Sequence, residues 1–187
     1  MSDGLASIIF LPVTPMTEHY SNTEKLTRLG FFTAFAITIY VAENFIPKPF
    51  PFMRLGLANI FILILLANGE FLSAVVVTLG KTVIGGFLSA TIISPTTILS
   101  LGGSLLALPI MYLFLKVRIN FSLIGISVIG AIVHNFTQII IVRLLLIRTN
   151  SIFYLTPILI ITGIATGIIT GYLAHLLMAK LPKLSEI

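Results

Sequence analysis

The sequence predicts an all-α integral membrane protein with six transmembrane helices in a single domain. Three observations support this prediction. Hydrophobic residues make up 57% of the 187-residue chain and charged residues only 9%, and the mean hydropathy is +1.13. Apolar runs recur along the chain between short polar segments. At about 20 residues per span, the length leaves no room for a separate soluble domain.

We place the spans at about residues 26–46, 54–67, 71–93, 98–115, 121–147 and 153–179. They form a membrane domain over residues 26–181, between an N-terminal segment, 1–25, and a C-terminal tail, 182–187. The segments on the same side of the membrane as the N-terminus contain six basic residues, Lys25, Arg28, Lys116, Arg118, Lys180 and Lys183. The segments on the opposite side contain three, Lys48, Arg54 and Arg148. The positive-inside rule therefore predicts that both termini are cytoplasmic.

Small side chains form a line along the first span. Gly30, Ala34, Thr38 and Ala42 recur every four residues, which places them on one stripe of a helix. Such a stripe lets another helix approach closely. The approaching helix could belong to this chain or to another subunit, and the sequence leaves both alternatives open. Glu43 and Asn44 follow at the outer end of the span.

The segment between the first two spans contains prolines at alternate positions, from Pro47 to Met53. It is predicted to be extended, either as a lid or as an ordinary interfacial connector. The short second span that follows carries Arg54 and Asn59, and Asn68 with Gly69 marks a turn after it.

The third span carries Lys81 near its middle, where a lysine must pair or line a cavity. Thr96 lies in the polar turn before the fourth span. In the fifth span, His134, Asn135 and Gln138 fall on one broad helical face, and Arg143 lies almost opposite His134. The sixth span repeats threonine and glycine every four residues, which indicates a helix-packing surface over Thr162–Thr170 and Gly163–Gly171.

Polar side chains from several spans are predicted to meet in the outer half of the membrane. The candidate substrate-binding residues are Glu43, Asn44, Arg54, Asn59, Lys81, Thr96, His134, Asn135 and Gln138. Polar groups at this depth are tolerated where they face a bundle interior or a wet cavity. The excess of positive charge favours an anionic ligand, and the apolar walls favour a partly hydrophobic one. The alternative is that His134 and Asn135 only tie two helices together by hydrogen bonds.

Several short motifs carry a resemblance to a known family. The segments Arg54–Ile60, Ser94–Thr96, Leu99–Gly103 and Ala131–Asn135 with Gln138 resemble the Gx transporter family, whose members are often labelled heptaprenyl diphosphate synthase component I. That family resembles the substrate-binding S components of energy-coupling factor (ECF) transporters. The resemblance covers roughly residues 26–181.

The resemblance implies an S-component-like bundle in a prokaryotic cell membrane that captures a vitamin-like molecule from outside. It implies docking through Gly30, Ala34, Thr38 and Ala42 onto a coupling transmembrane subunit that carries two cytoplasmic ATPases. Gly30 and Thr38 replace alanines of the usual docking pattern. ATP and Mg²⁺ are then expected in the partner ATPases, while this chain is expected to have no catalytic residues, metal site or cofactor of its own.

Other function classes fit the sequence less well. A prenyl diphosphate synthase needs clustered aspartates, and Asp3 is the only aspartate, although an accessory membrane subunit of such an enzyme stays open. No internal repeat typical of a secondary transporter is visible. His134 with Ser104 or Ser127 lacks the motif of a hydrolase. Basic residues are dispersed among helix ends, which disfavours nucleic acid as a partner.

Overall fold

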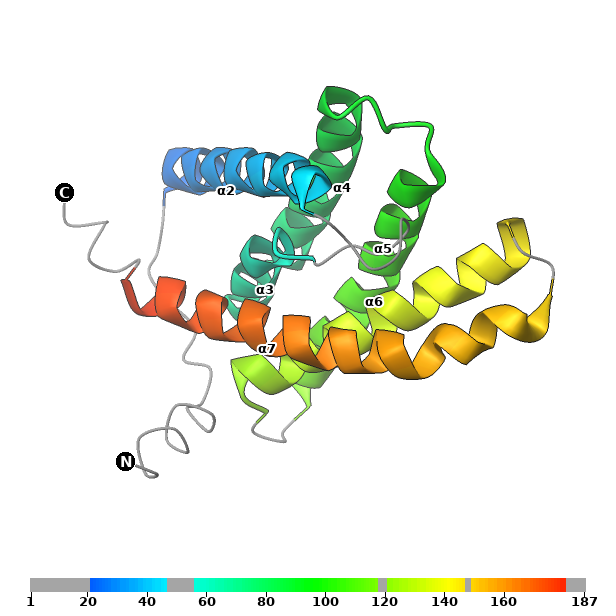
Figure 1. Cartoon of the computed structure of the whole chain (residues 1–187). Helices are drawn as coiled ribbons and strands as arrows, with labels where there is room; N and C mark the ends of the chain where they lie inside the picture. The colour runs from blue at the N-terminus through cyan, green and yellow to red at the C-terminus, as the bar shows by residue number, and fades with distance from the viewer. Residues whose placement is uncertain (1–20, 47–55, 118–120, 147–148, 181–187) are drawn as a thin grey trace.

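The computed structural model describes residues 21–46, 56–117, 121–146 and 149–180, and these ranges fold almost entirely into helices (Figure 1). They contain six α-helices and two short 3₁₀ segments. In chain order these are α2 (Asn22–Ala42), η1 (Glu43–Phe45), α3 (Asn59–Ala67), α4 (Phe71–Leu88), α5 (Pro95–Lys116), α6 (Leu123–Leu145), η2 (Asn150–Leu155) and α7 (Thr156–Lys180).

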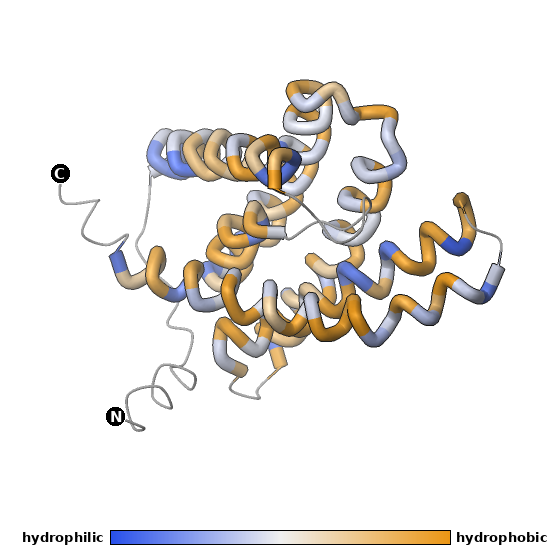
Figure 2. Tube along the Cα trace, in the orientation of Figure 1, coloured by the Kyte–Doolittle hydropathy of each residue, from blue (hydrophilic) through white to orange (hydrophobic). Residues whose placement is uncertain are grey.

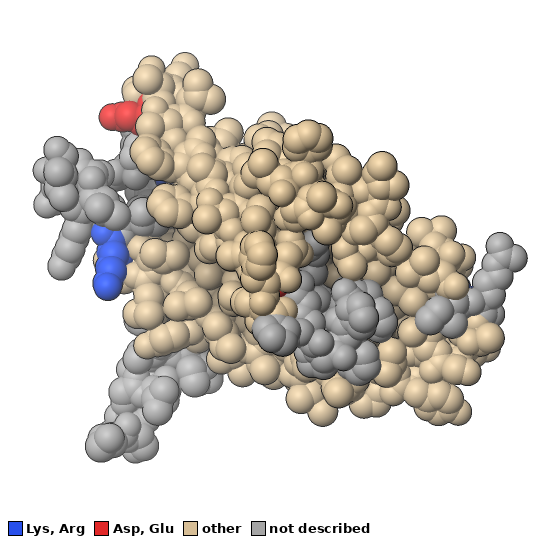
Figure 3. All heavy atoms as spheres, turned by 45° about the horizontal axis from the view of Figure 1, so that its top comes forward, with Lys and Arg blue, Asp and Glu red and all other residues tan. Residues whose placement is uncertain are grey.

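Five helical segments are long and apolar enough to cross a membrane, which indicates a multi-pass membrane protein. They are Asn22–Phe45, Phe71–Leu88, Pro95–Lys116, Leu123–Leu145 and Asn150–Lys180. In Figure 2 orange hydrophobic residues recur along these helices between paler residues, and blue residues are few. In the view of Figure 3 most of the described surface carries no charged side chain, and the clearest acidic and basic groups lie toward one edge. The side of the membrane on which each terminus lies stays a prediction.

The second predicted span is the main departure from the sequence analysis. Of its described residues, 56–67, only Asn59–Ala67 are helical, a rise of about 14 Å at 1.5 Å per residue, against the ~30 Å of a bilayer core. Every residue from Ile60 to Ala67 is buried, and α3 contacts each of the other five α-helices. The apolar run at 54–67 therefore reflects a short helix enclosed by protein on all sides rather than a full lipid-facing span.

Two helix ends also differ from the expected bounds, and both have local causes. Helix α2 begins at Asn22 rather than near residue 26, because Ser21 and Glu24 form a capping box. Helix α4 ends at Leu88 rather than near residue 93, where Ala90 adopts a φ of 53° and the chain turns. The apolar Ile92 and Ile93 that extended the predicted span lie exposed in the connection that follows.

Helix α2 packs on α4 through one face. Phe32, Ala36 and Tyr40 are buried, and the ring of Tyr40 lies so close to the backbone of α4 that a Cβ at Gly85 would come within 2.5 Å of its Cδ1. At the other end of α2, Arg28 forms an ion pair with Glu70, just before α4. The two helices are thus joined at both ends.

Helices α6 and α7 lie side by side (Figure 1) and approach each other at glycines. A Cβ at Gly167 would lie 2.7 Å from Cα of Val128, and one at Gly171 would lie 2.6 Å from Cα of Ile124. Both neighbours are backbone atoms, so no side chain could rotate away. The predicted helix-packing surface of the sixth span is therefore confirmed for its glycine line.

Candidate functional site: a polar cavity inside the helix bundle

A cavity lies where α3, α5, α6 and α7 meet. The volume available in it to the centres of water molecules is about 30 Å³, enough for a few waters. Its walls combine small, polar and apolar side chains. The lining residues are Gly56, Asn59, Ile62, Leu63, Ser104, Ala107, Met111, Ser127, Gly130, Ala131, His134, Asn135, Thr166, Gly167 and Thr170.

A smaller cavity adjoins the first one and shares Gly56, Asn59 and His134 with it. The volume available there to water centres is about 10 Å³. Its other lining residues come from α2, η1, α4, α5 and the turn before α3, and they are Tyr40, Glu43, Ala58, Lys81 and Ser100. Four of the nine predicted substrate-binding residues, Glu43, Asn59, Lys81 and His134, thus line one small space. The structure thus brings these four residues from distant spans together, while their depth in the membrane stays a prediction.

Glu43 binds the backbone at the start of α3. Its side chain is 2% exposed, and its carboxylate accepts hydrogen bonds from the backbone N–H groups of Gly56 at 3.3 Å, Leu57 at 2.5 Å and Ala58 at 3.4 Å. Gly56 has a φ of 77°, which favours glycine at this turn. A carboxylate is well placed there because helix N-termini carry free N–H groups and a partial positive charge.

Lys81 reaches the first residue of α3 from α4. Its ammonium group donates a hydrogen bond to Oδ1 of Asn59, and the side chain is 2% exposed. The sequence required a lysine at this depth to pair or to line a cavity, and here it does both. Glu43 and Lys81 thus place opposite charges at the same small cavity, both bound to the beginning of α3.

His134 occupies the boundary between the two cavities. Its Nε2 lies 3.1 Å from Nε2 of Gln138, one turn along α6, so one of the two nitrogens must accept, and only the imidazole nitrogen can do so. The ring lies flat against α5, where a Cβ at Gly103 would come 2.7 Å from Nδ1. Gln138 is buried behind His134, does not line either cavity, and its Oε1 has no hydrogen-bond partner among the described residues.

Asn135 has a structural contact and a place in the larger cavity. Its Nδ2 donates to the backbone carbonyl of Leu159 at 2.8 Å, which ties α6 to α7. The same side chain lines the cavity and is 5% exposed. Asn135 therefore does both things that the sequence analysis considered: it joins two helices by a hydrogen bond, and it lines the cavity.

Hydroxyl groups on three helices complete the larger cavity, and sequence reasoning did not assign them to it. They belong to Ser104 on α5, Ser127 on α6, and Thr166 and Thr170 on α7. The Oγ of Ser104 is buried and makes no hydrogen bond within the described residues. In the sequence, Thr166 and Thr170 appeared only as part of the packing repeat. Their position one residue before each packing glycine is the signal that could have placed them beside α6.

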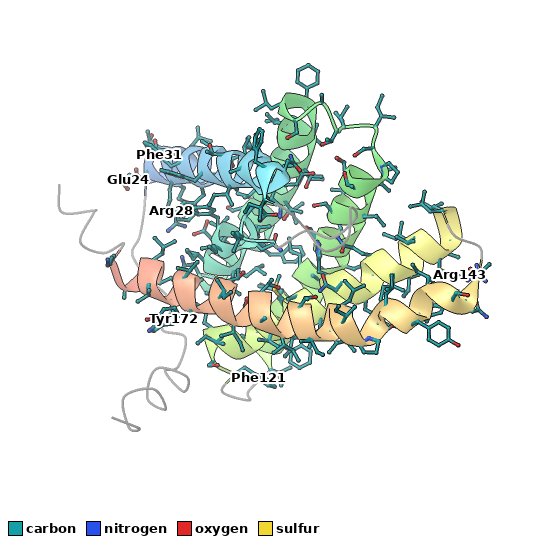
Figure 4. All side chains as sticks on the ribbon, viewed as in Figure 1. Glu24, Arg28, Phe31, Phe121, Arg143 and Tyr172 are labelled. Carbon is teal, nitrogen blue, oxygen red and sulfur yellow. The ribbon has the colours of Figure 1, made fainter. Side chains whose placement is uncertain are left out.

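The remaining predicted site residues lie elsewhere. Asn44 donates to Oγ of Ser89 at 2.7 Å, and Thr96 pairs with Ser94 at 2.6 Å; neither lines a described cavity. Arg54 and the segment 47–53 lie outside the described residues. Arg143, labelled in Figure 4 at the far end of α6, donates to Oδ1 of Asn150 at 3.0 Å and so contacts η2 instead of the cavity.

The small-residue line of α2 faces outward. Gly30, Ala34, Thr38 and Ala42 are all exposed, and a Cβ at Gly30 would meet nothing within 4 Å. The line lies almost opposite the face that Phe32, Ala36 and Tyr40 bury against α4, since a shift of two residues rotates a helix by about 200°. Packing within the described chain therefore does not explain the line, and Phe31 beside it also points away from the fold (Figure 4).

Within the described ranges, no group of three or more His, Asp or Glu side chains lies close enough together to hold a metal ion. The comparisons with known proteins give one match, to the family described as heptaprenyl diphosphate synthase component I, over residues 32–177. No curated protein and no solved structure gives a significant match.

Proposed function

This chain belongs to the heptaprenyl diphosphate synthase component I family, and from that premise we propose that it is the substrate-binding S component of an ECF-type ABC importer. In this role it captures a vitamin-like or related small molecule from outside the cell. It delivers the molecule together with a coupling transmembrane subunit and two cytoplasmic ATPases, which supply ATP and Mg²⁺. The chain itself has no catalytic role and no cofactor in this proposal.

The observation that carries the proposal is a cavity between the apolar helices whose lining includes several polar side chains. Buried polar groups in membrane helices are costly, and they are retained where they serve a ligand or a pathway. Asn59, His134 and Asn135 bring amide and imidazole groups to this cavity from two helices. A site of this kind suits capture of a small molecule and needs no reactive group.

The cavity must widen to accept a vitamin-sized ligand. Sites for such ligands commonly measure about 300–1,000 Å³, far more than the space that the bundle now encloses. The side chain of Met111 can change its conformation to make room, because it is flexible and lines the cavity. Its thioether now packs against Gly130 on α6. The proposal therefore includes a more open bundle when the ligand is bound.

The exposed line on α2 supports docking onto a coupling subunit. Small side chains allow two helices to approach closely in a membrane. Such a line is formed by Gly30, Ala34, Thr38 and Ala42, which are all exposed in the described fold. An intramolecular packing role would have buried them.

The family description favours a second candidate function. It names a component of a prenyl diphosphate synthase, so the chain could be an accessory membrane subunit of such an enzyme. The two candidates differ in their partners, which makes affinity purification from native membranes the deciding experiment.

We expect the tagged wild-type protein to copurify with a membrane subunit and ATPases, and Ala34→Leu to lose them because a bulky side chain holds the partner helix away. The matched control is Ala165→Leu on the exposed face of α7, which should keep the partners. Copurification with a prenyl synthase and no ATPase would contradict the importer proposal and favour the second candidate.

A further inference from the structure

The charges near the cavity are already engaged by the fold. The anionic group, Glu43, accepts hydrogen bonds from three backbone amides at the start of α3. The cationic group, Lys81, donates to Asn59. Both line the smaller cavity, and neither lines the larger one. Because one positive and one negative side chain line the smaller cavity, its described wall offers a ligand little net charge to neutralise.

The described part of the larger cavity wall carries no charged side chain. Among its described lining residues there is no aspartate, glutamate, lysine or arginine. Its polar groups are amides, hydroxyls and one imidazole. A helix N-terminus, which would otherwise attract an anion, does come close at Gly56, but Glu43 already occupies its N–H groups.

An anionic ligand would be poorly compensated in such a space. Moving a carboxylate or phosphate from water into a low-dielectric cavity without an opposing charge carries a large desolvation cost. Uncharged polar groups lose much less and can be matched by hydroxyl and amide partners. The described walls therefore disfavour the anion that the excess of cationic residues among the predicted site residues suggested.

One group in the cavity has its hydrogen-bonding capacity unused. Ser104 is 3% exposed and lines the cavity, and its Oγ makes no hydrogen bond with the described residues. A hydroxyl can donate one hydrogen bond and accept two, so it can recognise a hydroxyl, carbonyl or amide. Ala107 and Met111 follow Ser104 at three and seven residues on the same face of α5 and supply apolar wall beside it.

We infer that this cavity recognises an uncharged hydrogen-bonding group, such as a hydroxyl, carbonyl or amide, carried on a partly apolar small molecule and bound in part by Ser104. The inference rests on the proposed capture function and specifies the chemical class of its substrate. It replaces the anionic ligand that the sequence analysis favoured.

The test is mass spectrometry of the small molecules released from the full-length protein after purification in mild detergent, in both ion modes. We expect a stoichiometric compound with no phosphate or carboxylate, whose occupancy falls about tenfold in Ser104→Ala after a matched wash. The variant should fold normally, because the Oγ has no hydrogen bond to a described residue to lose. Thr137→Ala is the control, since it removes a buried hydroxyl of α6 that donates to the carbonyl of Val133 outside the cavity.

Each result has a distinct meaning. A retained phosphate or carboxylate compound overturns the inference and leaves the capture function standing. A neutral compound whose occupancy is the same in Ser104→Ala and Thr137→Ala overturns the assignment to this cavity. A protein that retains no compound contradicts the capture function, and the inference falls with it.

Discussion

Replacing Gly167 by alanine should destabilise the protein by forcing α6 and α7 apart. The added Cβ would lie 2.7 Å from Cα of Val128 and 3.1 Å from its N, where ordinary contacts begin at 3.4 Å. The helices must therefore separate by roughly 0.7 Å at this point, because backbone atoms cannot move aside singly. Overpacking of this kind costs about 1–3 kcal/mol.

Gly30→Ala is the matched comparison. Both positions lie inside long helices, so both substitutions gain about 1 kcal/mol of helix propensity, but a Cβ at Gly30 meets nothing within 4 Å. The difference between the two variants isolates the packing cost. At about 2–4 °C per kcal/mol for a chain of this size, Gly167→Ala should melt roughly 2–12 °C below Gly30→Ala.

The melting measurement needs an assay that uses neither tryptophan nor cysteine, because the chain contains neither. Far-UV circular dichroism or size exclusion of heated detergent samples meets that condition. If Gly167→Ala melts at or above the temperature of Gly30→Ala, the close approach of α6 and α7 is wrong, and with it the shape of the cavity that Gly167 lines.

Three further substitutions test the groups around the cavity. Glu43→Ala should lower the stability by about 1–3 kcal/mol, since it leaves buried and part-buried amides at the start of α3 unpaired, and Glu43→Gln should lower it less; equal melting temperatures for both variants and the wild type would contradict this anchoring role. Gly103→Ala should push the imidazole of His134 off α5 and shift its NMR signal; an unchanged signal would refute that contact. Asn135→Ala should both lower the melting temperature by a few degrees, through loss of the bond to Leu159, and reduce ligand retention; loss of stability with full retention would leave Asn135 only a helix-tying group.

Hydropathy predicted the helices well but not where they end. An apolar run looks the same whether it faces lipid, fills a protein core or continues into a connection. The described part of the run at 54–67 contains a helix of only nine residues, and the turn before it is bound by Glu43 from a distant part of the sequence, which no local pattern indicates. The run at 71–93 is cut at Leu88 by a turn at Ala90, whose positive φ no pattern of apolar residues indicates.

The sequence predicted those residues of the candidate site whose polar side chains are energetically unfavourable inside a membrane. Lys81, Asn59, His134 and Glu43 stood out as polar groups at depth, and the fold brings them together. Ser104 and Ser127 were considered only as hydrolase nucleophiles and were not assigned to the cavity, because serine is common in packed membrane helices. The charge of the ligand stays a prediction, but the sequence could not show that Lys81 and Glu43 are both bound to the start of α3.

The central claim is that a small molecule binds in the cavity between α3, α5, α6 and α7, and filling that cavity tests it most directly. Ala107 is 3% exposed and lines it, so Ala107→Val adds two carbon atoms inside the site. Ala165→Val makes the same change on the exposed face of α7. The quantity to measure is the amount of small molecule that each purified variant retains. We predict that Ala107→Val loses the retained compound while staying folded and that Ala165→Val keeps it; wild-type retention in a folded Ala107→Val would contradict the claim.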